Sequence, residues 1–378
     1  MKPILAAVAA FSLSTGMVTA QGFELPNQLS WTAYDTGSAG YNQAVAIGAA
    51  LQDAAGINLR VLPGKNDVSR TEPLRQGRVQ FSATGVGGSF MAQEGAFDFG
   101  AENWGPQPVR VLLANNGGAI NLAVGVAGDL GIETYADLKG KRVAYIVGAP
   151  ALNVNTEAYL AYGGLTWDDV VRVDFGGFGA SWTGLIEGQV DAAFAATNSG
   201  NAYEAAAGPR GLFWPPVDPE DAEGLAAMQA IAPFFLPNKA SVGANIDGTD
   251  GYQGAGYPYP VLVATSETET DLVYNMTKAM VELFPAYDGK APGIGGWALD
   301  KQEMEWVVPY HEGTIQYFKE VGVWTEEAQA NNDRLIERQA VLKAAWDALK
   351  AEAPADWEAA WSEARRKALA DNGFEVVF

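Results

Sequence analysis

Asp35-Thr36-Gly37-Ser38-Ala39-Gly40-Tyr41 and Gly148-Ala149-Pro150-Ala151-Leu152-Asn153-Val154-Asn155-Thr156 are the two stretches that decide the fold. Each stretch follows a predicted strand, at 29–33 and at 143–147, and leads into a predicted helix. Strands that alternate with helices in this way indicate an open α/β sheet. Loops of this kind direct unpaired backbone N–H groups and the positive end of a helix toward an anion. The two stretches therefore predict an anion-binding element in each half of the chain.

The small and amide side chains of these two stretches are candidate ligand contacts. Beside Gly37, the hydroxyls of Thr36 and Ser38 can donate hydrogen bonds, and Asn153 and Asn155 can do so through their amides. Simple helix capping is the alternative explanation for Thr36, Asn153 and Asn155. The presence of both loops in one chain favours a shared ligand held between them.

Three further features extend the candidate site. Arg70 follows the loop 63–67, where its guanidinium could bind a carboxylate through two hydrogen bonds; an exposed surface arginine is the alternative. Asn198 follows the predicted strand 192–196, at the carboxyl end that faces a crevice in open α/β sheets. Aromatic side chains can form flat cleft walls, with packing in the core as the alternative, and the candidates are Trp31, Tyr34, Trp104, Trp182, Trp214 and Tyr252.

Residues 1–20 have the pattern of a signal peptide. Lys2 precedes the apolar run 4–13, and small residues at 18–20 precede Gln21. The pattern predicts export to the periplasm and a mature chain that begins near Gln21; a buried N-terminal helix is the alternative. Since no later stretch approaches the roughly 20 apolar residues of a membrane helix, we expect no stable insertion into a membrane.

Composition excludes several classes of function. The net charge of −21 argues against nucleic acid and anionic membranes as partners, because phosphate binding needs clustered lysine and arginine. The sequence has no cysteine for disulfides or thiolate chemistry, and His311 is its only histidine, which leaves little from which to build a metal site or a catalytic triad. No metal, cofactor or catalytic residue is therefore predicted, and we expect that the protein is not an enzyme.

The length predicts more than one lobe, since 378 residues exceed what one hydrophobic core usually serves. We expect a first lobe at 21–117, a second lobe at 118–253, a return to the first lobe at 254–324 and a helical C-terminal extension at 325–378. The extension is rich in Ala, Glu, Lys and Arg, and Leu335, Leu342, Trp346 and Leu349 form a helical stripe. This stripe is expected to pack on the body of the protein; a surface for a partner is the alternative.

Several segments, taken in order, resemble the TAXI family, the TRAP-associated extracytoplasmic substrate-binding proteins. They are Thr36-Gly37-Ser38-Ala39-Gly40-Tyr41, Asp137-Leu138-Lys139-Gly140-Lys141-Arg142-Val143, Glu187-Gly188-Gln189-Val190-Asp191-Ala192-Ala193-Phe194, Tyr257-Pro258-Tyr259-Pro260-Val261-Leu262-Val263 and Pro309-Tyr310-His311-Glu312-Gly313-Thr314. The resemblance runs from Ser30 to Val323 and implies a two-lobed periplasmic-binding-protein fold of type II, the flytrap fold. It also implies that His311 packs structurally.

The resemblance implies that a small organic carboxylate, such as a dicarboxylate, a 2-oxo acid or an acidic amino acid, is delivered to a sodium-coupled TRAP membrane permease. The cleft residues that it carries over are Thr36, Ser38 and Tyr41 in the first loop, and Asn153 and Asn155 in the second. Two positions depart from the family. The second loop reads Ala151-Leu152-Asn153-Val154 where Gly-Ser-Gly-Thr is usual, and Arg70 stands where a neutral amide is more frequent. The added arginine could match a second negative charge, so a dicarboxylate is the first expectation.

Hinge closure around the ligand is the expected mechanism, because a ligand that bridges both lobes binds the closed state better than the open one. The protein is expected to act as a monomer. A ligand-sensing module that signals to a membrane receptor is the first alternative. A secreted hydrolase that works through carboxylates such as Asp35, Glu94 or Asp191 is the second.

Overall fold

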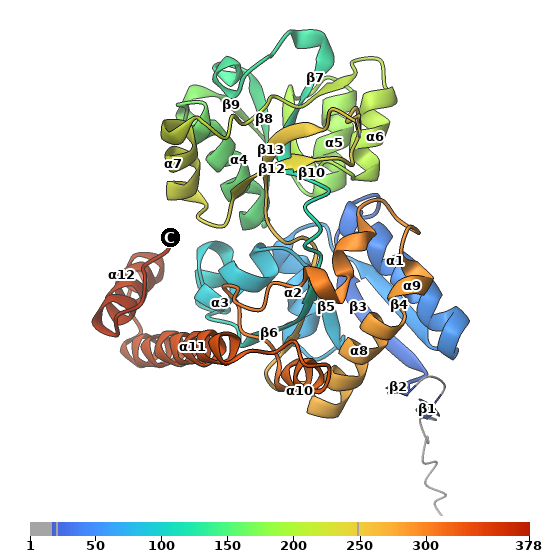
Figure 1. The fold of residues 1–378 in the computed structure, drawn as a ribbon. Coiled ribbons are helices and arrows are strands. Elements are labelled where there is room, and N and C mark those ends of the chain that lie inside the picture. The colour runs from blue at the N-terminus through green and yellow to red at the C-terminus, as the bar shows by residue number, and fades with distance from the viewer. Residues whose placement is uncertain (1–16, 20–21, 248) are drawn as a thin grey trace, which may run out of the picture.

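Two α/β lobes, one above the other in Figure 1, make up the body of the protein. The structure is a computed structural model that describes residues 17–19, 22–247 and 249–378. Most of the predicted signal peptide lies outside these residues. The short strand β1 (Met17–Thr19) pairs with β2 (Glu24–Pro26) at the edge of the first lobe.

Lobe 1 is built on a five-stranded sheet with the strand order β4-β3-β5-β14-β6. Its strands are β3 (Gln28–Ala33), β4 (Asn58–Pro63), β5 (Phe81–Thr84), β6 (Val109–Ala114) and β14 (Val261–Thr265). Its helices are α1 (Ala39–Ala55), α2 (Asp67–Arg75), α3 (Ala92–Glu94), α8 (Thr270–Glu282), α9 (Phe284–Tyr287) and α10 (Glu312–Glu320). Strand β3 runs parallel to β4 and β5, whereas the returning strand β14 is antiparallel to β5 and β6.

Lobe 2 repeats this construction with the strand order β11-β7-β10-β8-β9. Its strands are β7 (Leu122–Ala127), β8 (Arg142–Ile146), β9 (Val171–Phe175), β10 (Ala192–Ala196) and β11 (Leu212–Phe213). Its helices are α4 (Pro150–Tyr162), α5 (Phe178–Ile186), α6 (Gly200–Ala207) and α7 (Ala222–Ile231). The antiparallel pair β12 (Leu236–Ala240) and β13 (Tyr252–Gly256) completes the lobe.

The chain crosses between the lobes twice within the body, after β6 and after β13. Figure 1 shows the two crossings as thin connecting segments. The second crossing lets β14 enter the sheet of lobe 1 between β5 and β6. Strands β7 and β10 are buried along their whole length, because helices or loops cover both faces of the sheet. Two open α/β sheets joined in this way confirm the predicted two-lobed fold class. The exact lobe boundaries stay predictions; β13 itself spans the expected boundary at 253.

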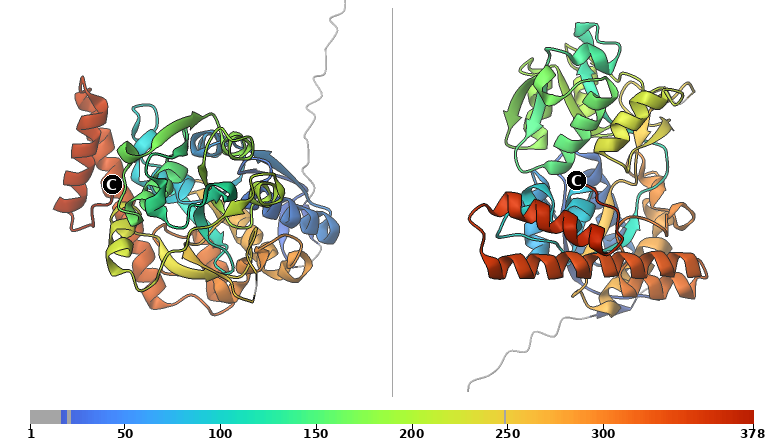
Figure 2. Two further views of the ribbon diagram at one scale, coloured as in Figure 1. Left: turned by 90° about the horizontal axis from the view of Figure 1, so that it is seen from above. Right: turned by 90° about the vertical axis from the view of Figure 1, so that its left-hand side faces the viewer.

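The C-terminal extension consists of α11 (Glu326–Glu352) and α12 (Trp357–Asp371), which Figure 2 shows as an arm along lobe 1. Of the predicted stripe, Leu342, Trp346 and Leu349 are buried and cluster with residues of α12 and the segment after it, whereas Leu335 is half-buried. A buried carboxylate, that of Glu94, ties both helices to lobe 1. It accepts hydrogen bonds from Arg338 on α11 at 2.7 Å and from Arg365 on α12 at 3.1 Å.

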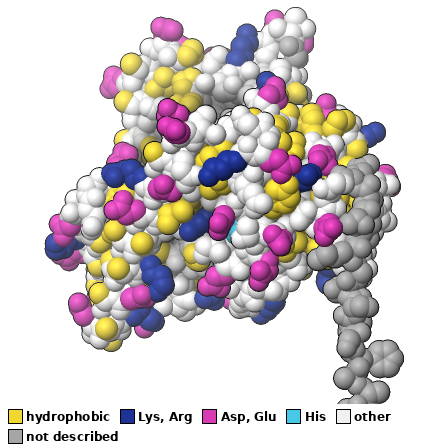
Figure 3. All heavy atoms as spheres, turned by 60° about the horizontal axis from the view of Figure 1, so that its bottom comes forward, with side chains coloured by type: hydrophobic (Ala, Val, Ile, Leu, Met, Phe, Trp, Pro, Cys, Tyr) yellow, Lys and Arg dark blue, Asp and Glu magenta, His cyan; other side chains and the backbone are white. Residues whose placement is uncertain are grey.

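Acidic and basic side chains are interspersed on the face in Figure 3, where the single histidine shows as a small cyan patch. Within the described part of the chain, no helix is both long enough and apolar enough to cross a bilayer.

Candidate ligand-binding site

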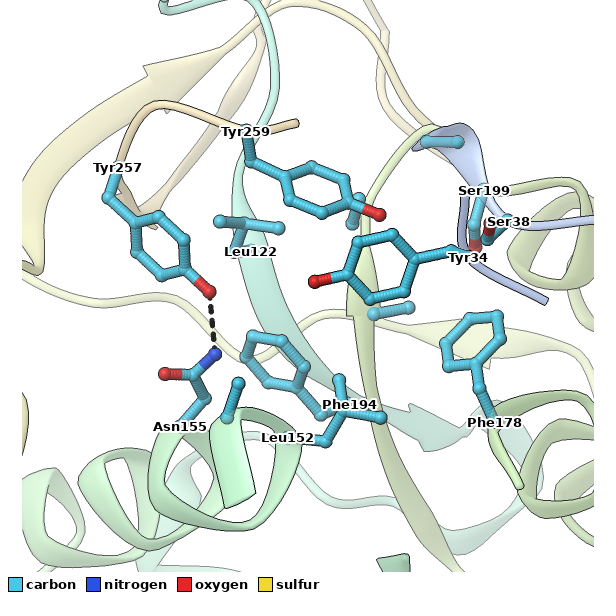
Figure 4. A pocket seen from close by; sticks show the side chains of 14 residues that line it. Tyr34, Ser38, Leu122, Leu152, Asn155, Phe178, Phe194, Ser199, Tyr257 and Tyr259 are labelled. Carbon is cyan, nitrogen blue, oxygen red and sulfur yellow. Dashed lines mark hydrogen bonds between the residues drawn. The ribbon is translucent and has the colours of Figure 1, made fainter. Parts of the chain in front are cut away.

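A small cavity lies where the two lobes meet, and residues of both lobes and of the second crossing line it (Figure 4). The lining residues are Tyr34, Ser38, Ala39, Leu122, Ala151, Leu152, Asn155, Phe178, Phe194, Ala195, Ala196, Ser199, Tyr257 and Tyr259. Its volume of about 20 Å³ leaves room for one or two water molecules. A small organic acid therefore enters only if the lobes or the lining side chains move apart.

Four helix N-termini converge on this cavity. Ser38 is the N-cap of α1 and Ser199 the N-cap of α6, while Ala151 and Phe178 lie in the first turns of α4 and α5. Each helix N-terminus carries roughly half a positive charge from its aligned peptide dipoles. Their convergence makes the cavity favourable for a negatively charged group.

Neutral polar groups supply the remaining chemistry of the lining. Burial raises the pKa of Tyr34 to about 12 and raises the pKa of Tyr257 and Tyr259 well above the usual value of 10.0. All three phenols are therefore protonated at neutral pH. The amide of Asn155 donates to the Tyr257 hydroxyl at 2.7 Å, and its buried Oδ1 has no hydrogen-bond partner among the described residues. This oxygen can accept a hydrogen bond from a bound ligand.

Arg70 lies one layer behind the cavity wall. Its guanidinium carbon is 3.5 Å from the centre of the Tyr34 ring, and its side chain is completely buried. The Arg70 guanidinium pairs with the Asp67 carboxylate and donates to the Thr84 hydroxyl at 3.2 Å. Its charge is already balanced by Asp67. The expectation of a dicarboxylate, which rested on an unpaired Arg70, therefore loses its basis.

Hydrogen bonds between the lobes surround the cavity. The Asp67 carboxylate on lobe 1 accepts from the backbone N–H of Ala151 on lobe 2 at 2.9 Å. The Asp35 carboxylate on lobe 1 accepts from the N–H of Gly179 at 3.2 Å, and the carbonyl of Gly37 accepts from the N–H of Gly200 at 2.8 Å. Each donor lies in the first turn of a lobe 2 helix, α4, α5 or α6. The lobes thus meet in a closed arrangement.

Comparison with known proteins identifies the family. The model of the NMT1-like family matches residues 33–322, which is more than half of the chain. The chain belongs to the NMT1-like family. No curated protein sequence matches it significantly.

Solved structures with a similar arrangement share little sequence with this NMT1-like protein. A protein from Bordetella bronchiseptica RB50 is 15% identical, with 84% of this chain and 99% of that chain covered and a TM-score of 0.46. The alkanesulfonate-binding protein SsuA from Xanthomonas axonopodis pv. citri, bound to MOPS, is 16% identical, with coverages of 83% and 84% and a TM-score of 0.42. A periplasmic binding protein of an ABC transporter from Brucella ovis, with glutathione bound, is 12% identical, with coverages of 69% and 70% and a TM-score of 0.43.

Three of the sequence-predicted residues, Tyr34, Ser38 and Asn155, line the cavity of this NMT1-like protein. The Ser38 hydroxyl also accepts from the N–H of Tyr41 at 3.2 Å as the cap of α1. Tyr41 is half-buried on α1 and Thr36 is exposed, and neither side chain lines the cavity. Gly37 contributes through its backbone, since it has a left-handed φ of 86° and accepts the hydrogen bond from lobe 2.

The two other predicted amides hold backbone in place. Asn153 bonds both the N–H and the carbonyl of Ile146, at 2.9 and 2.8 Å, and so fixes the loop between β8 and α4. Asn198 donates to the carbonyl of Pro292 on lobe 1 at 2.6 Å. Its buried Oδ1 has no partner in the described part of the chain. Neither side chain lines the cavity.

Trp182 and Tyr252 lie in the core of lobe 2 and not on a cleft wall. The indole N–H of Trp182 donates to the carbonyl of Phe194 at 3.1 Å, and the Tyr252 hydroxyl donates to the carbonyl of Pro215 at 2.8 Å. Both side chains are less than a tenth exposed. Their bulk and their satisfied polar atoms account for this position, since large aromatic side chains stabilise a core most when a hydrogen-bond partner is within reach.

Sequence reasoning missed several lining residues, among them Phe178, Phe194, Ser199, Tyr257 and Tyr259. The aromatic pair in Tyr257-Pro258-Tyr259-Pro260 was the available signal, because it stands just before the returning strand. His311 caps α10, where its Nδ1 accepts from the N–H of Gly313 at 3.1 Å, in line with its expected structural packing. Within the described residues, no cluster of three or more metal-ligating side chains occurs.

Proposed function

We propose that this protein is the periplasmic solute-binding component of a membrane transporter of the TRAP type, and that its solute is a small organic carboxylate. One observation carries the proposal: four helix N-termini, from both lobes, converge on one cavity between the lobes, and two of them, α1 of lobe 1 and α6 of lobe 2, are capped by neutral serine hydroxyls and not by a carboxylate. Such an arrangement stabilises an anion without a basic side chain in the lining.

The carboxylate is expected at the end of the cavity where α1 and α6 begin. Ser38 and Ser199 cap these helices with neutral hydroxyls, and each hydroxyl proton remains free to donate to a ligand. The hydrogen bond from Gly200 to Gly37 brings the two serines next to one another. The Asn155 oxygen can accept from a hydroxyl or amino group of the same ligand. Acids that carry such a donor, hydroxy acids and amino acids, therefore fit the lining best.

Binding requires the lobes to open and close. The closed cavity has room for only one or two water molecules, so the solute enters an open state and is then enclosed. The two crossings, after β6 and after β13, are the segments that can act as a hinge. A shift from mostly open to mostly closed needs about 5 kcal/mol of preferential binding, which a few charge-assisted hydrogen bonds can supply.

The lining favours binding over catalysis. Among the described residues that line the cavity, none carries a carboxylate, an imidazole or an amine. Such groups most often perform general acid–base catalysis, and burial keeps the three tyrosines of the lining protonated, which makes them poor bases. We therefore propose a protein that holds its solute unchanged.

The TRAP type rests on the resemblance of five segments to the TAXI family. Uptake of the radiolabelled solute into right-side-out membrane vesicles of the source cells tests it. With this protein added, uptake is expected to follow an imposed sodium gradient and to need no ATP. Uptake that depends on ATP and ignores sodium would assign the protein to another transporter class.

A thermal-shift screen tests the carboxylate, because a ligand that binds only the folded state raises the melting temperature. Acetate, lactate, malate, serine and glutamate form the panel, each with the amide or ester of all its carboxyl groups as the counterpart that lacks a carboxylate. We expect at least one acid to raise the melting temperature while its counterpart does not. For that acid, Ser199→Ala should weaken binding by about tenfold in calorimetry, while Ser241→Ala, on the exposed surface, should leave it unchanged. Shifts of equal size for the acids and their carboxylate-free counterparts would contradict the proposal.

A further inference from the structure

Two helices of lobe 2 lack an N-terminal cap from their own lobe. Helix α4 begins after Ala149 and helix α5 after Gly177, and no side chain of the described chain within lobe 2 caps either one. Helices usually begin with Ser, Thr, Asp or Asn, whose side chain accepts an otherwise unpaired N–H. Ser38 caps α1 and Ser199 caps α6 in this way.

Lobe 1 supplies the missing acceptors. The carboxylate of Asp67 accepts the N–H of Ala151 in the first turn of α4, and that of Asp35 accepts the N–H of Gly179 in the first turn of α5. The carbonyl of Lys65, also on lobe 1, accepts the N–H of Phe178 at 3.2 Å. A negative charge at a helix N-terminus is stabilised by the peptide dipoles as well as by the hydrogen bond.

We propose that Asp35 and Asp67 are positioning residues that hold the two lobes closed, because they cap in trans the two helices that lobe 2 leaves uncapped. When the lobes separate, both helices lose an anionic acceptor, and Asp67 stays with Arg70 alone. Closure therefore gains free energy from groups of the chain itself. This inference concerns the lobes alone and does not depend on which solute the cavity binds.

Steric detail at the same contact supports a close approach. A Cβ atom on Gly179 would lie 3.1 Å from the Asp35 carboxylate, and one on Gly200 would lie 2.9 Å from the Gly37 carbonyl oxygen. Glycine at these helix starts lets the backbones of the two lobes approach each other. Gly200→Ala would stabilise helix α6 by itself but would obstruct closure of the lobes. The substitution therefore separates an effect on helix stability from an effect on closure.

The distance between the lobes can be measured directly by electron–electron double resonance. Since the sequence has no cysteine, spin labels attach only at introduced sites, and V45C on α1 with V171C on β9 places one at an exposed position of each lobe. The full-length protein without added solute is compared with D35A and G200A in this background. D53A, on the exposed face of α1, is the matched control. D67N/R70Q tests the second cap without leaving a buried arginine unpaired.

We expect the unsubstituted protein to populate a short interlobe distance, and the control to match it. In D35A and G200A, the ratio of closed to open molecules should fall by about tenfold, the value of one hydrogen bond across the cleft. In D67N/R70Q the ratio should also fall, because the acceptor of the Ala151 N–H loses its negative charge. Unfolding in urea checks that each variant is folded. Distance distributions that match the unsubstituted protein in all three variants, or an unsubstituted protein that is entirely open, would overturn the inference. Either result would leave the proposed solute binding untouched.

Discussion

Asp67 on lobe 1 and Ala151 on lobe 2 are joined by a 2.9 Å hydrogen bond from the Ala151 N–H to the Asp67 carboxylate. The same carboxylate pairs with Arg70, which packs under the Tyr34 ring in the cavity wall. One buried side chain thus links the ion pair of lobe 1 to the first turn of a lobe 2 helix. The relationship connects the stability of lobe 1 to the closure of the cleft.

Removal of the Arg70 side chain should destabilise the fold. Arg70→Ala leaves the Asp67 carboxylate buried without its guanidinium, and a broken buried pair typically costs about 3–5 kcal/mol. The free energy of unfolding in urea is the measurement, with Arg60→Ala as the exposed control. The neutral double variant D67N/R70Q should lose less than Arg70→Ala. If Arg70→Ala unfolded at the same urea concentration as the unsubstituted protein, the pair would not be buried as described.

The pair of Asn155 and Tyr257 should matter for both stability and binding. Tyr257→Phe removes the acceptor of the Asn155 amide and leaves that buried group unpaired, at a cost of about 1–3 kcal/mol. Affinity for the solute should fall as well, because the freed amide can turn its oxygen away from the ligand. Urea unfolding and calorimetry measure the two effects. Tyr203→Phe, on the exposed side of α6, should change neither.

His311 should make stability depend on pH. Burial lowers its pKa to about 4 in the folded protein, from 6.5 as the ordinary value. Between these two pH values the unfolded chain protonates His311 whereas the folded protein does not. The free energy of unfolding is therefore unaffected by His311 above pH 6.5 and falls as the pH drops from 6.5 toward 4, by up to about 3 kcal/mol.

His311→Asn tests this dependence because asparagine does not titrate. The asparagine side-chain oxygen can replace the His311 Nδ1 as the acceptor of the Gly313 N–H. Urea unfolding at pH 7 and pH 4.5 gives the loss for each protein. The variant should lose less stability between the two values than the unsubstituted protein. Equal losses would mean that His311 titrates alike in the folded and unfolded states.

Glu94 should control how firmly the C-terminal extension is held. Glu94→Gln leaves the buried guanidiniums of Arg338 and Arg365 without a counter-ion, which should cost about 3–5 kcal/mol. Hydrogen exchange in α11 and α12 should accelerate. Glu102→Gln removes an exposed pair with Lys350 and should cost less than about 1 kcal/mol. Unchanged exchange in Glu94→Gln would show that apolar contacts alone fix the extension.

Local patterns predicted the fold well. Strand 192–196 has the predicted bounds, and α11 begins one residue after the expected start of the helical extension at 325. Strand β5 escaped prediction because two of its four residues, Ser82 and Thr84, carry hydroxyls. They are buried only because the Ser82 hydroxyl pairs with Thr32 at 2.9 Å and that of Thr84 pairs with Arg70. Such partners belong to the tertiary structure and leave no local signal.

The loops of the site could be predicted from the sequence, but the hydrogen bonds and ion pairs between its residues could not. Ser38 and Asn155 stand in glycine- or proline-marked stretches that are evident from the sequence. The position of Asp67 three residues before Arg70 does allow an ion pair on one helix face, which was the available sign that Arg70 is not free. That Asp67 also reaches α4 across the cleft depends on how the lobes meet, and nothing in the local sequence encodes this.

A crystal structure with the acid that gives the largest thermal shift tests the central claim most directly. We predict electron density for the acid inside the cavity of Figure 4, with its carboxylate within hydrogen-bond distance of the Ser38 and Ser199 hydroxyls. An acid bound outside this cavity, or one whose carboxylate points away from all four helix N-termini, would contradict the account.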